Sequence, residues 1–382
     1  MGMSPTRRDF FTGGFMGVTG FISGIVFGKK TSSTPPQTEV FGKPVLVKRR
    51  KVLTGDRLEP GIPNIQSLAS ATVCDRNGKV KNVFSPADDK QRINIHSAIK
   101  VLHGGLLVEE NEMARRGGRE SFEFGPRQIA ILVSSHGGSQ KHTDEVLEAL
   151  RITGIDENLI VTHRHPFDET ARDALIRANV PISETPPRYD QCSGHHTSQL
   201  IMSKLKGLPL QDYNKHDGEL QRQYLQGLQT YSGDSNAKIV AYDNCKVPTF
   251  EVSMPGFATA YARFIANSNF KPVVDAVTQH PVLIGDETSI DSNLILVTKG
   301  NLIAKGGAEG SLIVINKKLG DALILKEWSG NWTLRDRIII EALKELRWIT
   351  DREAETLFSM KSFALRDDEV GIVYDFKKPL WA

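Results

Sequence analysis

The sequence predicts an α/β fold in which an antiparallel sheet packs with a helical region in one domain. Strand-like patterns occur near both ends of the chain, and helical periodicity dominates the middle. No internal repeat or low-complexity tract interrupts these patterns. The 382 residues, 39% apolar and 24% charged, have the composition of an ordinary globular protein that buries a large core.

The composition also excludes some classes of protein. The formal net charge of +3 is spread along the chain, and no basic stripe stands out, so nucleic acid is not an expected partner. The three cysteines, Cys74, Cys192 and Cys245, are too few for a disulfide scaffold. Their odd number leaves at least one cysteine without an intramolecular partner.

Residues 1–36 resemble a twin-arginine export signal followed by a linker. Arg7 and Arg8 precede a spacer residue and Phe10, and a Gly-rich apolar stretch continues to Gly28. We therefore expect export to the periplasm or the extracellular space, with residues 37–382 forming the folded domain. The apolar stretch approaches the ~18 residues that span a bilayer and no Ala-x-Ala cleavage site follows it. Anchoring to a membrane through this segment is therefore considered as well.

The folded domain is expected to begin with strands. Residues 44–84 show short strand-like patterns, with a hairpin in which 71–74 and 79–81 pair across Asn77-Gly78. The period then changes, and the apolar stripe that follows predicts a helix beginning at or just before Ser97.

The middle of the chain is expected to be mainly helical. The short apolar run Ile129 to Val133 predicts a buried strand, and the small-residue turn Ser134 to Gly138 leads into an amphipathic helix over 143–151. We expect further helices at 169–178, 197–205, 220–228 and 258–266, and a strand at 239–242. Near the C-terminus we expect strands at 294–297, 302–304, 311–315 and 322–327, covered by a helix over 333–346.

A Ser-x-x-Lys motif offers a candidate nucleophile. On a helix, Ser97 and Lys100 lie on one face, where a desolvated lysine can lose its proton and accept that of the serine. Alone the motif is weakly specific, because Ser203 and Lys206 also match it and their segment has the pattern of a solvated helix end.

The order of three motifs adds weight. Lys305-Gly306-Gly307, between two predicted strands, is similar to the Lys-Thr-Gly strand of penicillin-recognising enzymes, although Lys318-Leu319-Gly320 matches equally well. Ser135 lies between the two lysine motifs, in a turn whose glycines allow a substrate to approach the backbone. Ser-x-x-Lys, a middle serine and Lys-x-Gly in this order match the layout of serine β-lactamases and penicillin-binding proteins.

A third cluster favours a metal. Cys192, His195 and Cys245 would form a three-ligand zinc site with one open position, the pattern of a catalytic site. Two alternatives stay open: a disulfide between Cys192 and Cys245, or buried free thiols. Asp243 follows a predicted strand and is a candidate to orient a lysine or bind a substrate amine. Cys74, in the hairpin, is expected in the core.

Together these segments resemble the asparaginase II family, whose fold is related to that of serine β-lactamases. The most specific matches are Cys192-Ser193-Gly194-x-His196, Asp243-x-Cys245-x-Val247-Pro248-Thr249-Phe250, Tyr261-Ala262-Arg263-Phe264 and Lys305-x-Gly307-Ala308-Glu309-Gly310. The resemblance implies two Ser/Lys tandems, Ser97 with Lys100 and Ser135 with Lys305. It also implies a metal held by Cys192, His195 and Cys245, supported by Asp243.

Three departures from the family pattern concern the substrate. His195 replaces a common lysine, Asn244 a common glycine, and His96 the usual arginine before the motif serine. His195 should bind zinc better than lysine would. Losing two cations puts specificity for free asparagine in doubt.

These observations predict an amidohydrolase that releases ammonia from L-asparagine or a related small amide, with Lys100 activating Ser97 and zinc nearby. One alternative is an exported serine hydrolase acting on a peptidoglycan amide or β-lactam. Another is an inactive homologue that binds a metal or an amino acid. A homodimer is the expected assembly.

Overall fold

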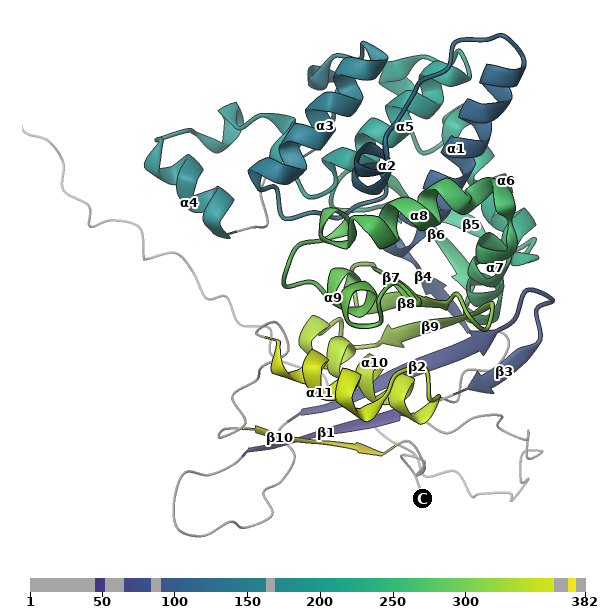
Figure 1. Cartoon of the computed structure of the whole chain (residues 1–382), viewed down its shortest axis with the longest axis vertical. Coiled ribbons are helices and arrows are strands. Elements are labelled where there is room, and N and C mark those ends of the chain that lie inside the picture. Colours follow the sequence, from purple (N-terminus) through teal and green to yellow (C-terminus); the bar gives the residue numbers. More distant parts are fainter. Residues whose placement is uncertain (1–44, 52–64, 84–90, 163–168, 361–369, 376–382) are drawn as a thin grey trace, which may run out of the picture. The chain divides into compact units, whose positions relative to one another are not determined.

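The computed structural model describes residues 45–51, 65–83, 91–162, 169–360 and 370–375, all within the unit Val40–Ala382 (Figure 1). The predicted signal segment, residues 1–36, lies outside the described residues. Among the helices that the structure describes, none has the length and apolar character needed to cross a membrane.

The described part contains an antiparallel sheet in the order β10-β1-β2-β9-β8-β7, with β3 paired to β2 outside this path. The predicted hairpin of β2 and β3 is present, and its turn is held by Asp75, whose side chain accepts hydrogen bonds from the Asn77 and Lys79 backbone N–H groups. The strands are β1 (Val45–Lys51), β2 (Ile65–Cys74), β3 (Val80–Val83), β7 (Leu302–Gly306), β8 (Ser311–Asn316), β9 (Asp321–Glu327) and β10 (Val370–Asp375).

Both faces of the central strands are covered by helices. Alternate residues of β8 point to opposite sides: Leu312 and Val314 pack in one core with α9, α10 and α11, and Ile313 and Ile315 in the other. Helix α7 packs on β2, β8 and β9 in the second core. Strand β9 is buried along its whole length, so its residues do not alternate between buried and exposed.

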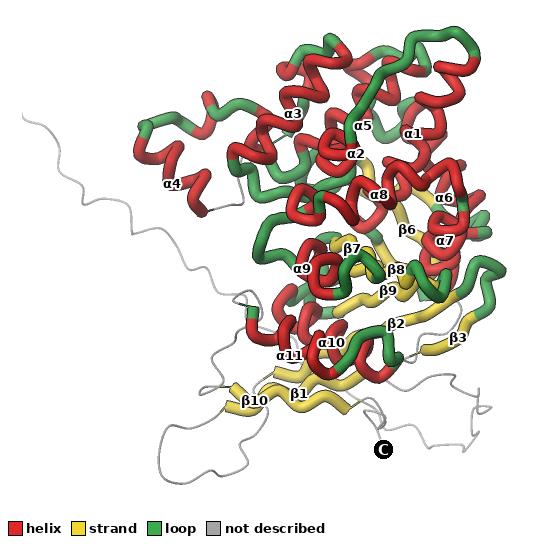
Figure 2. Tube along the Cα trace, viewed as in Figure 1, coloured by secondary structure: helices red, strands yellow, loops and turns green. Residues whose placement is uncertain are grey.

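The helical region holds most of the remaining helices (Figure 2) and a small sheet in the order β4-β6-β5 (Figure 1). Its strands are β4 (Arg92–Asn94), β5 (Lys238–Tyr242) and β6 (Pro248–Ser253). The helices of the described chain are α1 (Lys100–Arg116), α2 (Pro126–Leu132), α3 (Gln140–Thr153), α4 (Glu169–Arg177), α5 (Ser193–Leu205), α6 (Glu219–Ser232), α7 (Met254–Ala266), α8 (Lys271–Gln279), α9 (Ile290–Val297), α10 (Trp332–Glu345) and α11 (Asp351–Ser359). The predicted α/β class, an antiparallel sheet beside a helical region, is confirmed.

Two predicted strands are wrong, because both segments are helices. Residues 129–132 belong to α2 and Val133 is its C-cap. This helix begins with Pro126 after Gly125, and the Gln128 side chain accepts the Gly125 N–H at 3.0 Å. Residues 294–297 belong to α9, where the Ser289 side chain caps the Ser292 N–H. A short apolar run buried on several sides has no periodicity that separates a helix from a strand.

Helix α5 packs closely against α2 because residue 194 is a glycine. A Cβ atom on Gly194 would collide with the backbone carbonyl of Ile131. Since α5 carries the Cys192 end of the predicted metal cluster and α2 leads into the Ser135 turn, this close approach brings the two candidate segments together.

Candidate active site

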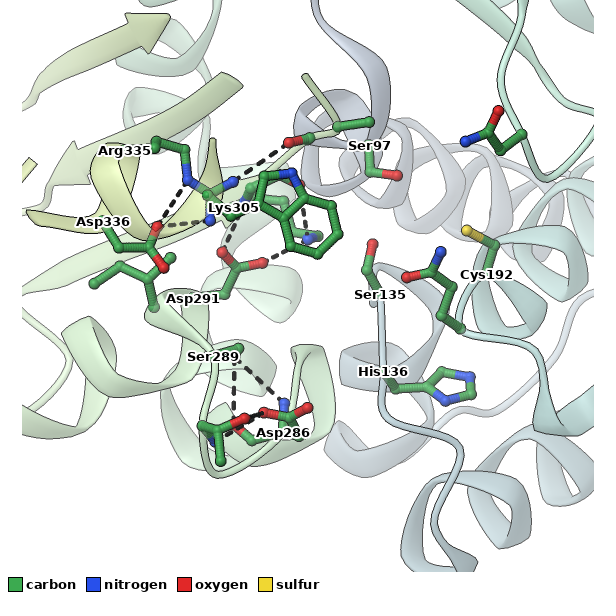
Figure 3. A pocket seen from close by; sticks show the side chains of 18 of the residues that line it. Ser97, Ser135, His136, Cys192, Asp286, Ser289, Asp291, Lys305, Arg335 and Asp336 are labelled. Carbon is green, nitrogen blue, oxygen red and sulfur yellow. Dashed lines mark hydrogen bonds and ion pairs between the residues drawn. The ribbon is translucent and has the colours of Figure 1, made fainter. Parts of the chain in front are cut away.

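A cavity of about 420 Å³ collects candidate residues from the sheet and the helical region (Figure 3). Ser97 and Ser135 both line it, as does Cys192. Other residues that line it are His136, Gln191, Asp243, Asn244, Cys245, Asp286, Asp291, Lys305, Gly307, Trp332, Thr333, Arg335 and Asp336. Segments distant in the sequence therefore share one site, as the motif order predicts.

Ser97 lies in the short 3-10 helix η1 (His96–Ile99), which continues into α1 at Lys100. The helix predicted to begin at or just before Ser97 therefore begins at His96, as a 3-10 turn. The sheet reaches this segment through Gly307, the residue after β7: a Cβ atom there would lie 2.6 Å from the Ile95 carbonyl oxygen. Only a residue without a side chain allows β7 to come so near the candidate serine.

The buried Lys100 donates hydrogen bonds to three groups near the cavity. Its Nζ donates to the Ser134 carbonyl at 2.9 Å, to Ser135 Oγ at 2.9 Å and to Cys192 Sγ at 3.2 Å. These bonds use the three N–H groups of an ammonium, so its hydroxyl partner is Ser135 and not Ser97. Lys100 therefore contacts the serine that the family resemblance pairs with Lys305.

The surroundings of Lys100 also change its proton affinity. Burial alone would lower the pKa of Lys100, as the sequence-based expectation assumes. The nearby Cys192 and Cys245 sulfurs and the Asp243 carboxylate outweigh burial, and the pKa of Lys100 is raised.

The Ser135 turn is fixed by backbone hydrogen bonds on both sides. Ser135 N–H donates to the Ile284 carbonyl at 3.0 Å, and the N–H of His136 donates to the Gln191 carbonyl at 3.0 Å. The buried His136 ring contacts Ser193 Oγ at 2.9 Å and accepts the Gly138 N–H at 3.1 Å. The position of Ser135 relative to Cys192 is therefore built into the backbone of both segments.

Cys192 and Cys245 are buried free thiols that contact each other. The hydrogen bond from Cys245 and, against burial, the charge of Lys100 lower the pKa of Cys192. The same hydrogen bond, together with burial, raises the pKa of Cys245 well above its usual value. Cys192 is therefore the thiol that ionises first, and Cys245 keeps its proton. The third cysteine, Cys74, is buried in the core as expected.

His195 points into the helical region. Its Nε2 lies 3.1 Å from His103 Nδ1 and 3.3 Å from the amide nitrogen of Gln199, whose oxygen accepts from Gln221 at 2.8 Å. The other ring nitrogen, Nδ1 of His195, is buried and has no hydrogen-bond partner among the residues that the structure describes.

No group of three His, Cys, Asp or Glu side chains converges as a metal-binding set among the residues described here. Zinc binding by Cys192, His195 and Cys245 would require both thiols to be ionised and His195 to be neutral. The zinc prediction stays a prediction, and direct metal analysis tests it.

Asp243 is paired with His96, the residue that replaces the family's arginine. Nδ1 of His96 lies 3.4 Å from Asp243 Oδ1, and its Nε2 lies 3.1 Å from the carboxylate of Glu309. Burial opposes a charged imidazole, but the two carboxylates outweigh it and raise the pKa of His96. Burial likewise opposes ionisation of Asp243, whereas His96 and the Asn244 N–H lower its pKa. His96 thus keeps a titratable positive charge at this position.

Lys305 belongs to a different network. Its Nζ donates to Asp291 Oδ2 at 2.5 Å and to the Gly306 carbonyl at 3.0 Å (Figure 3). Next to it, Arg335 donates to Asp336 at 2.7 Å. Burial lowers the pKa of Lys305 and raises that of Asp336 to about 6. Asp291, Arg335 and Asp336 lie in no sequence motif, so the residue pattern alone does not predict them as part of the site.

Two serines and two buried lysines therefore lie beside a thiol pair around one cavity of an α/β fold. A family model for L-asparaginase II matches residues 61–373, so the chain belongs to the L-asparaginase II family, whose members hydrolyse amides. The resemblance drawn from the motifs is confirmed.

Comparison with other proteins gives only distant similarities. No curated protein sequence matches the chain. Among solved structures it is similar to a β-lactamase from Mycobacterium bovis, at 13% identity and a TM-score of 0.39 over 72% of this chain and 94% of that one. It is also similar to a penicillin-binding protein from Bacillus halodurans (14%, 0.30, 79% and 97%) and to an octameric penicillin-binding protein homologue from Pyrococcus abyssi (10%, 0.33, 72% and 73%).

Proposed function

We propose that this protein releases ammonia from L-asparagine or a closely related carboxamide through a serine nucleophile activated by Lys100. The observation that carries the proposal is the contact of Lys100 Nζ with Ser135 Oγ at 2.9 Å, in a cavity that Ser97 also lines. A lysine amine beside a hydroxyl is an established way to activate a serine for attack on a carbonyl carbon. Membership of the L-asparaginase II family supports an amide as the substrate.

In the proposed reaction Ser97 attacks the amide carbon, and its proton passes through Ser135 to Lys100. Lys100 can accept it when the proton that it shares with Cys192 lies on the sulfur, 3.2 Å away. The C–N bond then breaks, and the same proton leaves with the nitrogen as ammonia. Water, deprotonated by Lys100, cleaves the acyl-serine ester and restores the free hydroxyl. Lys305 would bind the developing oxyanion or fix the cavity wall through Asp291.

The direct test is ammonia release from L-asparagine and L-glutamine by the purified protein and by the Ser97→Ala and Ser135→Ala variants. Ser97→Ala should abolish turnover, and Ser135→Ala should slow it by about 10²-fold or more, the scale of a lost proton-transfer step. If both variants keep the wild-type rate, the mechanism is wrong. Thermal unfolding of the variants is the control for folding.

A second candidate, hydrolysis of a peptidoglycan amide or β-lactam, is favoured by the size of the cavity. Its volume of about 420 Å³ exceeds what a small amino acid needs and lies in the ~300–1,000 Å³ range of sites for larger ligands. Incubation with a fluorescent penicillin separates the two candidates: a covalent adduct at Ser97 would favour the second.

Zinc, export and dimerisation are proposals that the same preparation can test. Metal analysis of the wild type and the Cys245→Ser variant measures zinc per chain. Sedimentation or light scattering measures the proposed homodimer. Fractionation of cells expressing the full chain, with a variant in which Arg7 and Arg8 are both changed to Lys, tests export through the proposed signal and any membrane attachment.

A further inference from the structure

We infer that the preferred substrate is a carboxamide with no free carboxylate close to the reacting amide, either neutral or carrying an amine. This inference rests on the proposed amidase function and concerns the substrate class. It follows from the charges that surround the cavity, because a free carboxylate that leaves water needs a cation or several hydrogen-bond donors in return.

The lysine and the arginine among the described residues that line the cavity are already paired. Lys305 Nζ lies 2.5 Å from Asp291, and both residues are buried. Arg335 contacts Asp336 at 2.7 Å through Nη2, and its Nη1 donates to the carbonyls of Gly307 and Ser311. A substrate carboxylate would have to displace a protein carboxylate from one of these pairs.

The cations next to the cavity are engaged as well. The three N–H groups of Lys100 are used by Ser134, Ser135 and Cys192. The imidazole of His96 lies between Asp243 and Glu309. His96 stands where the family commonly has arginine, and two protein carboxylates already neutralise its charge.

Negative charge is in excess along the cavity wall. Four aspartates line it, Asp243, Asp286, Asp291 and Asp336, and face the two cations described above. Asp286 is half-buried, and its Oδ1 accepts hydrogen bonds from the N–H and the hydroxyl of Thr288. An anionic group that enters this cavity meets a repulsive field, whereas an amine meets an attractive one.

The N-terminus of α10 is the other place where an anion would be stabilised, since Trp332 and Thr333 line the cavity there. A protein carboxylate already occupies this end. Glu327 is fully buried and accepts the N–H groups of Asn331 at 2.7 Å and Ser329 at 3.1 Å. The Asn331 side chain caps the next donor, the Leu334 N–H. The Glu327 carboxylate therefore already places a negative charge at this end of α10.

The test compares ammonia release from L-asparagine and from its α-N-methylamide, in which the carboxylate is masked and only the side-chain amide yields ammonia. We expect a kcat/KM at least about tenfold higher for the methylamide, with the difference mainly in KM. An equal or higher kcat/KM for free L-asparagine would overturn the inference while leaving the proposed function intact. No ammonia from either compound would refute the proposed function and the inference with it.

A charge-only variant tests the pairing itself. Asp336→Asn keeps the shape of the side chain but frees the charge of Arg335, so KM for L-asparagine should fall severalfold while kcat/KM for the methylamide changes little. Asp286→Asn removes one negative charge without freeing a cation, and it should shift the preference in the same direction by less. If Asp336→Asn unfolds, Asp286→Asn at its half-buried position still tests whether the negative charge of the cavity disfavours a carboxylate. Unchanged substrate preference in the folded variants would overturn the inference.

Discussion

Two buried lysines border the cavity, one in the helical region and one in the sheet, and their hydrogen-bond partners differ. Lys100, at the start of α1, contacts a serine hydroxyl and a thiol, and these neighbours raise its pKa. Lys305, in β7, forms an ion pair with Asp291, and burial lowers its pKa. Both side chains are about 1% exposed, so burial alone does not distinguish them.

The difference teaches that the partner decides the role of a buried cation. A thiol and a hydroxyl can exchange protons with Lys100, so this lysine can take part in chemistry. A carboxylate that bonds both Lys305 Nζ and the Gly306 N–H holds strand β7 to helix α9. We therefore expect loss of Lys100 to affect the rate and loss of Lys305 to affect the stability.

The largest expected effect is on activity. Lys100→Met should lower kcat by about 10³-fold or more, within the range that general acid-base groups contribute. The measurement is steady-state ammonia release together with thermal unfolding. A Lys100→Met protein that turns over at the wild-type rate would reverse the comparison.

The next effect is on stability. Lys305→Met leaves the Asp291 carboxylate buried without its cation and should cost about 3–5 kcal/mol in the free energy of unfolding. The double variant Lys305→Met/Asp291→Asn should recover part of this loss, because the unpaired charge is gone. Urea unfolding of both variants measures it. A single variant as stable as the wild type would show that the ion pair does not hold β7.

A smaller effect tests how closely the two regions must approach. Gly307→Ala places a methyl group against the backbone at Ile95 and Ala98, which should destabilise the protein by about 1–3 kcal/mol and slow turnover by displacing Ser97. Gly117→Ala, at the end of α1 where a Cβ would lie 3.3 Å or more from its neighbours, is the matched control. Equal effects of the two substitutions would contradict the proposed close contact.

The smallest effect is the pH dependence of the His96 side of the cavity. The folded-state pKa of His96 is raised, so its stabilising contacts with Asp243 and Glu309 are fully present below about pH 6.5 and fade as the pH rises through the raised value. His96→Asn, which suits the backbone angle φ of 45°, should therefore cost about 1 kcal/mol near pH 6 and progressively less at alkaline pH. Unfolding titrations at several pH values measure the difference. A constant difference would assign the effect to shape and not to charge.

The sequence alone determined the family, the α/β class and the residues of the cavity that lie in motifs. Residue order is enough for this, because Ser97, Lys100, Ser135, Cys192, Asp243, Cys245 and Lys305 lie in short matching segments that meet in one site. It also gave the hairpin, the long helices and most strands, since their periods and turn residues are local. The strand predictions for the two apolar runs were wrong, because a helix buried on several sides shows no periodic alternation of apolar and polar residues.

Only the tertiary structure decided which side chains pair. Lys100 donates a hydrogen bond to Ser135, and His195 contacts His103. Lys305 pairs with Asp291, a residue that lies in no motif. Such pairings depend on side-chain direction and on how closely two segments pack, and in this chain the glycines Gly194 and Gly307 set those distances. Charge balance in the cavity is a property of all its walls together, and no stretch of sequence contains all of them.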